Sequence, residues 1–233
     1  MLIKENLCIG CGQCVIVCPV QAISLMDDKA IIDKGKCVEC YVCYRDANCP
    51  TKAIRSERLK WPRIIRHPFS SVVAIHKLTG MPGRGTEEMK TNDITNRYKH
   101  GEIGFSIEIG RPGVGTLLKN IELFTTRLSQ IGVIYEKDSP VTAILIDNKG
   151  HIEPELREER VLSAIIEFKI SVKKLKKILQ IIREVEKIID TVFTVGLIAR
   201  VEKDNSIPVK NLLEKEGFNV EPNAKINIGL GKI

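Results

Sequence analysis

The stretch that decides the fold of the N-terminal region is residues 8–19, CIGCGQCVIVCP, with cysteines at positions 8, 11, 14 and 18. A second copy begins 29 residues later at residues 37–43, CVECYVC, and closes with a Cys-Pro pair at 49–50. The residues after each Cys-Pro pair also match, because VQAI at 20–23 corresponds to TKAI at 51–54. The first 56 residues therefore contain an internal repeat that includes all eight cysteines of the chain.

The spacing C-x2-C-x2-C-x3-C-P resembles that of bacterial-type ferredoxins with two [4Fe–4S] clusters, and the resemblance covers residues 1–58. In that family, three cysteines of one run and the fourth cysteine of the other run hold each cluster. Gly10 and Gly12 suit a backbone that presses against inorganic sulfur. The resemblance implies one cluster on Cys8, Cys11, Cys14 and Cys49, and a second on Cys37, Cys40, Cys43 and Cys18.

The second repeat departs from the family pattern between its third and fourth cysteines. Five residues separate Cys43 from Cys49, whereas three separate Cys14 from Cys18. We expect this insertion to change the solvent exposure, and hence the potential, of the neighbouring cluster without removing a ligand. Two alternatives are zinc in four-cysteine sites and disulfides. Zinc sites usually pair C-x2-C units across a longer gap, and disulfides do not suit an intracellular chain.

Length and composition exclude several classes of protein. The chain has 233 residues, of which 43% are hydrophobic and 28% are charged, so it is long enough for one or two domains with a real core. Disorder and collagen are excluded. No apolar run approaches the roughly 18 residues of a membrane-spanning helix, and Cys8 lies where a secretory signal would be apolar. We expect a cytoplasmic protein with no membrane partner.

Charge gives information about partners. The formal net charge is +7, but residues 1–56 are nearly balanced, with seven Lys or Arg against six Asp or Glu. Many free ferredoxins are strongly acidic and dock by charge, so the balance indicates a redox partner or reductase subunit that is tethered or held through the rest of the chain. Residues 55–68 are basic and contain two prolines, which predicts a solvated linker rather than a nucleic-acid site. No nucleic-acid partner is expected.

The rest of the chain predicts an α+β fold. Apolar residues alternate along 103–109, as in a half-buried strand, and recur every three or four residues along 117–131, as on one helix face. The order of the elements is typical of a ferredoxin-like (βαββαβ) α/β sandwich, and a homo-oligomer could form through this domain. The expected domains are 1–58, 59–102 (linker and loop) and 103–233. Further expected elements are strands at 133–135, 141–146, 161–170 and 191–201 (a long buried strand), a helix at 172–189 and a short helix within 207–233.

A long Gly-rich and charged segment at 80–100 is a candidate ligand site. Its glycine amides and Thr86 could bind an anion, with Arg84 and Lys90 supplying positive charge. An ordinary surface loop, or a cover over a cluster, is the alternative. Residues 80–115 resemble 6-hydroxynicotinate reductase-like iron–sulfur proteins of anaerobes, although this resemblance does not carry the activity with it.

The turn Gly110-Arg111-Pro112-Gly113 is a second candidate, since it is similar to the amino-acid-binding turn of ACT-type regulatory domains. A Pro-Gly turn is also common for backbone reasons alone. No nucleotide-binding or serine-hydrolase motif is present, and the catalytic residues are not assigned. The main functional hypothesis is electron transfer through two clusters to a reductase partner or to a site formed with the C-terminal domain. The alternatives are a small-molecule reductase and a redox-linked, metabolite-binding regulatory protein.

Overall fold

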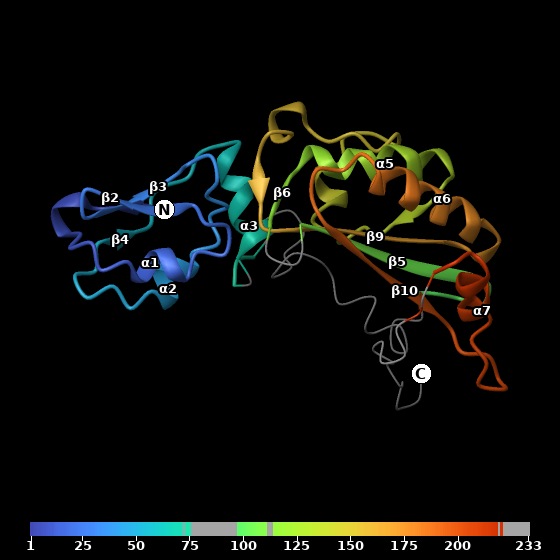
Figure 1. Ribbon diagram of the computed structural model, residues 1–233. Helices are drawn as coiled ribbons and strands as arrows, with labels where there is room; N and C mark the ends of the chain where they lie inside the picture. Colours follow the sequence, from blue (N-terminus) through green and yellow to red (C-terminus); the bar gives the residue numbers. More distant parts are fainter. Residues whose placement is uncertain (72, 76–96, 111–113, 219, 221–233) are drawn as a thin grey trace.

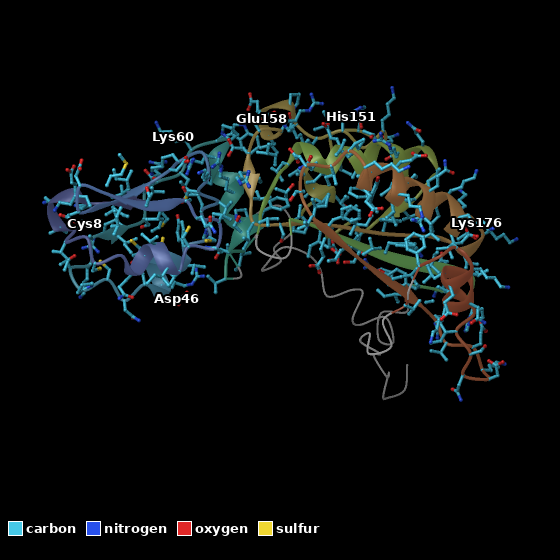
Figure 2. The ribbon with its side chains drawn as sticks, in the orientation of Figure 1. Cys8, Asp46, Lys60, His151, Glu158 and Lys176 are labelled. Atoms are coloured by element: carbon cyan, nitrogen blue, oxygen red, sulfur yellow. The ribbon has the colours of Figure 1, made fainter. Side chains whose placement is uncertain are left out.

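The computed structural model describes residues 1–71, 73–75, 97–110, 114–218 and 220. A small N-terminal module and a larger C-terminal unit lie end to end, with one short helix between them (Figure 1). Every described sulfur-containing residue belongs to the N-terminal module, as the yellow atoms in Figure 2 show. Within the described part of the chain, no helix is both long and apolar enough to cross a bilayer.

The N-terminal module consists of two small antiparallel ladders and two short helices. Each ladder uses the strand that follows a Cys-Pro pair, so the structure repeats as the sequence does. The ladders are β1 (Leu2–Ile3) with β4 (Ile54–Arg55), and β2 (Ile23–Met26) with β3 (Lys29–Ile32). The helices are α1 (Gln13–Ile16) and α2 (Val42–Asp46), and a 3-10 turn spans Glu5–Leu7.

The core of this module is small and contains thiols. Buried Met1, Ile23 and Ile54 pack together with the buried cysteines Cys8, Cys14 and Cys43. The other buried members of this cluster are alanines. Such a core buries little apolar area, so the module depends on what its cysteines bind.

Helix α3 (Arg66–Ser70) connects the module to the C-terminal unit, after a 3-10 turn at Arg63–Ile65. It packs against β8 (Arg160–Val161), and the Ser70 hydroxyl accepts a hydrogen bond from the Leu162 N–H at 2.9 Å. Arg66 is only 6% exposed. This part of the basic stretch is therefore packed between the two regions and is not solvated as the sequence predicted.

The C-terminal unit is built on a four-stranded antiparallel sheet with the order β10-β5-β9-β7. Its strands are β5 (Glu102–Ile109), β7 (Ile134–Tyr135), β9 (Ala164–Ser171) and β10 (Phe193–Ala199). Helices α5 (Lys119–Gln130) and α6 (Leu175–Glu186) lie side by side over one face of the sheet (Figure 1). A short ladder of β6 (Thr116–Leu117) with β8 flanks the sheet, 3-10 turns span Thr142–Ile144, Pro154–Leu156 and Val172–Lys174, and α7 spans Pro208–Lys215.

The apolar core lies between this sheet and the helices. Phe105 of β5 faces Phe168 of β9 in the strand register, and their rings stack with centroids 5.2 Å apart. Phe124 of α5 meets the ring of Phe193 edge-on at 5.1 Å. All the apolar residues that alternate along β5 are buried, which confirms the strand predicted over 103–109.

Two predicted strands differ from the structure. Residues 141–146 are not a strand: a 3-10 turn occupies Thr142–Ile144, and only an isolated bridge joins Leu145 to Ile152. A short apolar run fits a buried turn as well as a strand, and Val141 and Ile144 are indeed buried. The strand predicted to be long and buried is β10, which is shorter and half exposed because it forms an edge of the sheet. Helix α7 confirms the short helix, and residues 226–230 lie outside the described residues.

Candidate functional site

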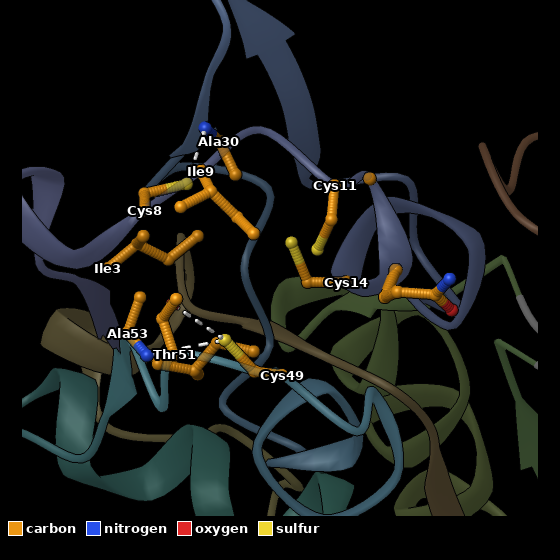
Figure 3. Close-up of a pocket in the computed structure, with 12 residues that line it drawn as sticks. Ile3, Cys8, Ile9, Cys11, Cys14, Ala30, Cys49, Thr51 and Ala53 are labelled. Carbon is orange, nitrogen blue, oxygen red and sulfur yellow. Dashed lines mark hydrogen bonds between the residues drawn. The ribbon is translucent and has the colours of Figure 1, made fainter.

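Four cysteines line one pocket of the N-terminal module, here called the first pocket. Cys8, Cys11 and Cys14 come from the first repeat, whereas Cys49 comes from the end of the second repeat. Figure 3 shows their sulfur atoms directed into a common space, with Ile3, Ile9 and Ala53 around it. The apolar lining and the four thiols together make a sulfur-rich site.

The other four cysteines line a second pocket. Cys37, Cys40 and Cys43 come from the second repeat, and Cys18 comes from the end of the first. Met1, Ile32 and Tyr41 are among the residues that complete the lining. The structure thus brings together the same two groups of three cysteines plus one that the resemblance to ferredoxins implied.

Left-handed backbone positions shape both cysteine loops. In the first loop these positions are Gly10 (φ +71°) and Gly12 (φ +75°), and Gly12 precedes α1. The equivalent positions 29 residues later are Glu39 (φ 56°) and Tyr41 (φ 61°), which hold an unfavourable conformation for residues with a side chain. Sequence reasoning missed these two residues, although aligning the repeats would have placed them opposite the glycines.

Backbone amides point at three of the cysteine sulfurs. The Ala22 N–H donates to Cys18 Sγ, and the Ala53 N–H donates to Cys49 Sγ, both at 3.2 Å and four residues along the chain. The Ala30 N–H of β3 donates to Cys8 Sγ at 3.3 Å. N–H groups aimed at sulfur stabilise negative charge there, which is what a thiolate ligand carries.

The thiol pKa values show what the pockets cost without a bound group. Burial raises the pKa of Cys43 to about 12, and the nearby Cys40 thiol adds to the shift. Burial likewise raises the pKa of Cys14, Cys37 and Cys40. Burial opposes the charged form of Cys49 too, but hydrogen bonds from Ala53 and Thr51 outweigh it and lower the pKa. Binding a metal group must therefore displace protons from most of these thiols.

Basic side chains surround the second pocket. The Arg66 Nη1 group donates to the carbonyl of Cys37 at 2.8 Å, and the Arg45 Nη1 group donates to the carbonyl of Cys40 at 3.0 Å. His67 stacks on Tyr41, with ring centroids 4.2 Å apart, and its Nδ1 lies 2.7 Å from the Glu39 carbonyl oxygen. The basic composition of 55–68 was the only sequence signal for two of these contacts, and it did not indicate burial.

The donor set fits an iron–sulfur cluster. Each pocket offers four sulfur ligands and no competing carboxylate in its lining, and soft thiolates favour iron–sulfur clusters or zinc. All eight cysteines are free thiols. Among the described residues, no three His, Cys, Asp or Glu side chains are arranged to hold a single metal ion. The thiols are thus spread around each pocket, as a larger group with several metal atoms requires.

The remaining predicted ligand residues, Arg84, Thr86, Lys90 and Arg111, lie outside the described residues. Next to the position of Arg111 in the sequence, the structure has an open pocket at the β6 corner of the C-terminal unit. It is lined by Val114–Leu117, Arg160 and Ile189–Val192. We name it the corner pocket.

Comparisons with known proteins identify the class of the N-terminal segment. A family described as a 4Fe-4S binding domain (Fer4) matches residues 1–24. A ferredoxin of Pyrobaculum islandicum is 40% identical over 55 residues, which cover 23% of this chain and 50% of the ferredoxin. One component protein of the H(2):CoB-CoM heterodisulfide,ferredoxin reductase is 34% identical over 74 residues in both Methanothermobacter thermautotrophicus and Methanothermobacter marburgensis.

These similarities are partial. The alignments to the two reductase proteins cover 24% of this chain and 11% of each of them, so the chain spans half or less of each of these relatives. No solved structure matches the chain significantly. The Fer4 match and the eight cysteines make the N-terminal segment an iron–sulfur-binding segment of ferredoxin type, characteristic of an electron carrier.

Proposed function

We propose that this chain is an electron-transfer protein that holds two [4Fe–4S] clusters and relays single electrons to a reductase partner or to a site formed with its C-terminal unit. The cluster in the first pocket is bound by Cys8, Cys11, Cys14 and Cys49, and the cluster in the second pocket by Cys37, Cys40, Cys43 and Cys18. When bound, the clusters supply one-electron redox chemistry.

The observation that carries the proposal is the exchange of the fourth cysteine between the repeats. Cys49 closes the first pocket and Cys18 closes the second, so each pocket gains four thiols only when both repeats are folded together. Two pockets of this kind within one module place two redox groups side by side. The amides directed at Cys8, Cys18 and Cys49 further suit negatively charged sulfur ligands.

The test is anaerobic purification of the full chain, followed by iron and sulfide analysis and electron paramagnetic resonance of the dithionite-reduced protein. We expect roughly eight irons per chain, four for each cluster. Replacing Cys11 by Ala should remove the signal of one cluster, and replacing Cys40 by Ala should remove the other. Ser24→Ala is a matched control, because Ser24 is an exposed residue of the same module.

Two outcomes would contradict the proposal. If both reduced signals survived either cysteine change, the ligand assignment would be wrong. If the native protein contained zinc in place of iron and sulfide, electron transfer itself would be excluded.

The C-terminal sheet supports a more specific fold. In order along the chain, its strands are β5, β7, β9 and β10, and in the sheet they are arranged fourth, first, third, second. With α5 and α6 inserted after the first and third strands, this is the arrangement of a ferredoxin-like α/β sandwich. Such a domain commonly binds a ligand or a partner chain, which suits a role as the acceptor side of the protein.

A second candidate function is regulation by a small metabolite, and the corner pocket is the observation that favours it. This pocket opens beside the strand-to-helix turn that resembles ACT-type domains. If it binds amino acids, a panel of them tested one at a time should include one that raises the melting temperature of the full cluster-containing chain. No shift with any of them, up to millimolar concentration, would exclude this function.

A further inference from the structure

The two cysteine pockets differ in the positive charge that contacts their loops. At the second pocket, Arg66 donates to the carbonyls of Cys37 (2.8 Å) and Lys34 (3.0 Å), while Arg45 donates to the carbonyl of Cys40 (3.0 Å). Two guanidinium groups are therefore fixed next to two of its cysteines. A guanidinium keeps its charge at any working pH.

The first pocket has a single contact of this kind among the described residues. The Lys29 ammonium donates to the carbonyl of Cys8 at 2.5 Å. Cys11 of the same pocket is exposed, so water screens charge there more strongly than at Cys37 and Cys40. At the level of hydrogen-bonded side chains, the second pocket has one more cation than the first.

Carboxylates near the second pocket do not cancel this difference. Glu39 lies between two of its cysteines and is fully buried, but it accepts hydrogen bonds from the Arg63 guanidinium at 2.6 and 3.0 Å and from the Met1 amino group at 2.5 Å. Glu159 pairs with Arg66 on the side away from the pocket, in the C-terminal unit. Within the part of the chain that the structure describes, Arg45 forms no salt bridge, so its charge beside Cys40 is uncompensated.

The second pocket is also the one that adjoins the C-terminal unit. Arg66 contacts the loop of Cys37 with one end of its guanidinium and Glu159 with the other. Val20, two residues after Cys18, lies within van der Waals reach of the Gly115 position in the corner pocket. The first pocket, with its exposed Cys11, faces solvent instead.

We infer that the guanidinium groups of Arg45 and Arg66 make the second pocket the preferred site of a transferred electron, and so direct electrons from the solvent-facing first pocket toward the C-terminal unit. The inference rests on the proposed function. One electron leaves the first site, which is oxidised, and enters the second site, which is reduced; no bond or proton changes place. The added negative charge is stabilised where fixed cations are close and poorly screened.

The test is a redox titration of the full cluster-containing chain, followed by electron paramagnetic resonance. Cys11→Ala and Cys40→Ala identify the signal of each site. In the native protein, we expect the first electron to populate the second site at least tenfold over the first, which corresponds to about 59 mV for a one-electron couple.

Three charge variants separate the effect of charge from that of structure. Arg45→Gln should lower the potential of the second site alone and reduce the preference severalfold, whereas Arg45→Lys should retain it. Because Arg45 is exposed and its hydrogen bond goes to the Cys40 carbonyl, the fold should tolerate both changes. Lys29→Gln is the matched control at the other pocket: it should lower the potential of the first site and increase the preference.

Arg66 is a positioning residue with a second role in the contact between the two regions. Glu159→Gln removes its partner but keeps its charge, so the preference for the second site should persist or grow in that variant. If the first electron entered the first site, or both sites equally, in the native protein, the inference would be overturned. It would also be overturned if Arg45→Gln and Lys29→Gln shifted the same signal. Two clusters with equal potentials would leave the proposed function intact, whereas fewer than two clusters would contradict that function instead.

Discussion

The N-terminal module and the C-terminal unit are stabilised in different ways. In the module, cysteines make up a third of the buried core cluster, and the few large apolar residues beside them are Met1, Ile23 and Ile54. In the C-terminal unit, the core includes Phe105, Phe124 and Phe168 together with residues from helices and sheet, and it contains no thiol. The comparison teaches that one region folds around what its cysteines bind, while the other folds on apolar burial.

The largest expected effect is therefore that of removing the clusters. Treating the protein with an iron chelator and an oxidant should abolish amide-exchange protection in the β2–β3 ladder, because crowded thiols cannot replace the bound groups. Protection in β5 and β9 should persist, since their core does not involve cysteine. Hydrogen exchange measured by mass spectrometry reports both regions at once. Equal protection in the module before and after treatment would show that the module is stable by itself.

The converse change acts on the C-terminal core. Phe168→Ala removes a fully packed ring that stacks on Phe105 and meets Tyr135 edge-on, and it should lower the free energy of unfolding of this unit by about 3–5 kcal/mol. Urea unfolding followed by circular dichroism measures the loss, while visible absorbance follows the clusters. Val195→Ala on the exposed edge strand is the control and should cost about 0.5 kcal/mol or less. If absorbance were lost at the same lowered urea concentration, the two regions would unfold as one.

A smaller effect is expected within the module, at the glycines of the first cysteine loop. A Cβ at Gly10 would lie 2.4 Å from the Asp28 carbonyl oxygen, whereas a Cβ at Gly12 would meet only the flexible Leu25 side chain at 3.7 Å. Both positions have positive φ, which by itself costs about 1–3 kcal/mol for alanine. Gly10→Ala should therefore lower iron occupancy of the first pocket more than Gly12→Ala. Equal iron content in the two variants would show that the Asp28 contact yields easily.

The smallest effect concerns pH and lies in the C-terminal unit. Hydrogen bonds from the His151 side chain and backbone lower the pKa of Asp147 to about 2. A depressed carboxyl pKa contributes stability above the unfolded value near 3.8, and this stability is lost as the pH falls toward 2. His151→Ala should raise the pKa of Asp147 toward 3.8 in an NMR titration. An unchanged pKa would show that the backbone N–H groups suffice.

Sequence patterns predict the elements of this protein better than the contacts between them. Alternation along 103–109 and helical spacing along 117–131 anticipate β5 and α5, because each pattern follows from burying one face of a regular element. The apolar residues at 141–146 are misread as a strand, since a short buried run carries no decisive period. The pair Arg66 and Glu159 joins residues 93 positions apart, and no local pattern encodes such a contact.

The site shows the same limit. The family resemblance anticipates which cysteines share a pocket, but not that Arg45 in the insertion and Arg66 in the basic stretch reach the cysteine carbonyls. Both arginines read as ordinary surface charge in the sequence. Their placement depends on how α2 and α3 pack on the cysteine loops, which is a tertiary property.

The exchange of cysteines between the repeats has a consequence for the order of synthesis. The ribosome releases a chain from its N-terminus, and domains generally fold as units. The first pocket begins with Cys8 but lacks a wall until Cys49 emerges, whereas the second pocket has all its cysteines once Cys43 emerges. The pocket that starts first is finished last, so a nascent chain that stops between these two cysteines has a complete site beside an open one.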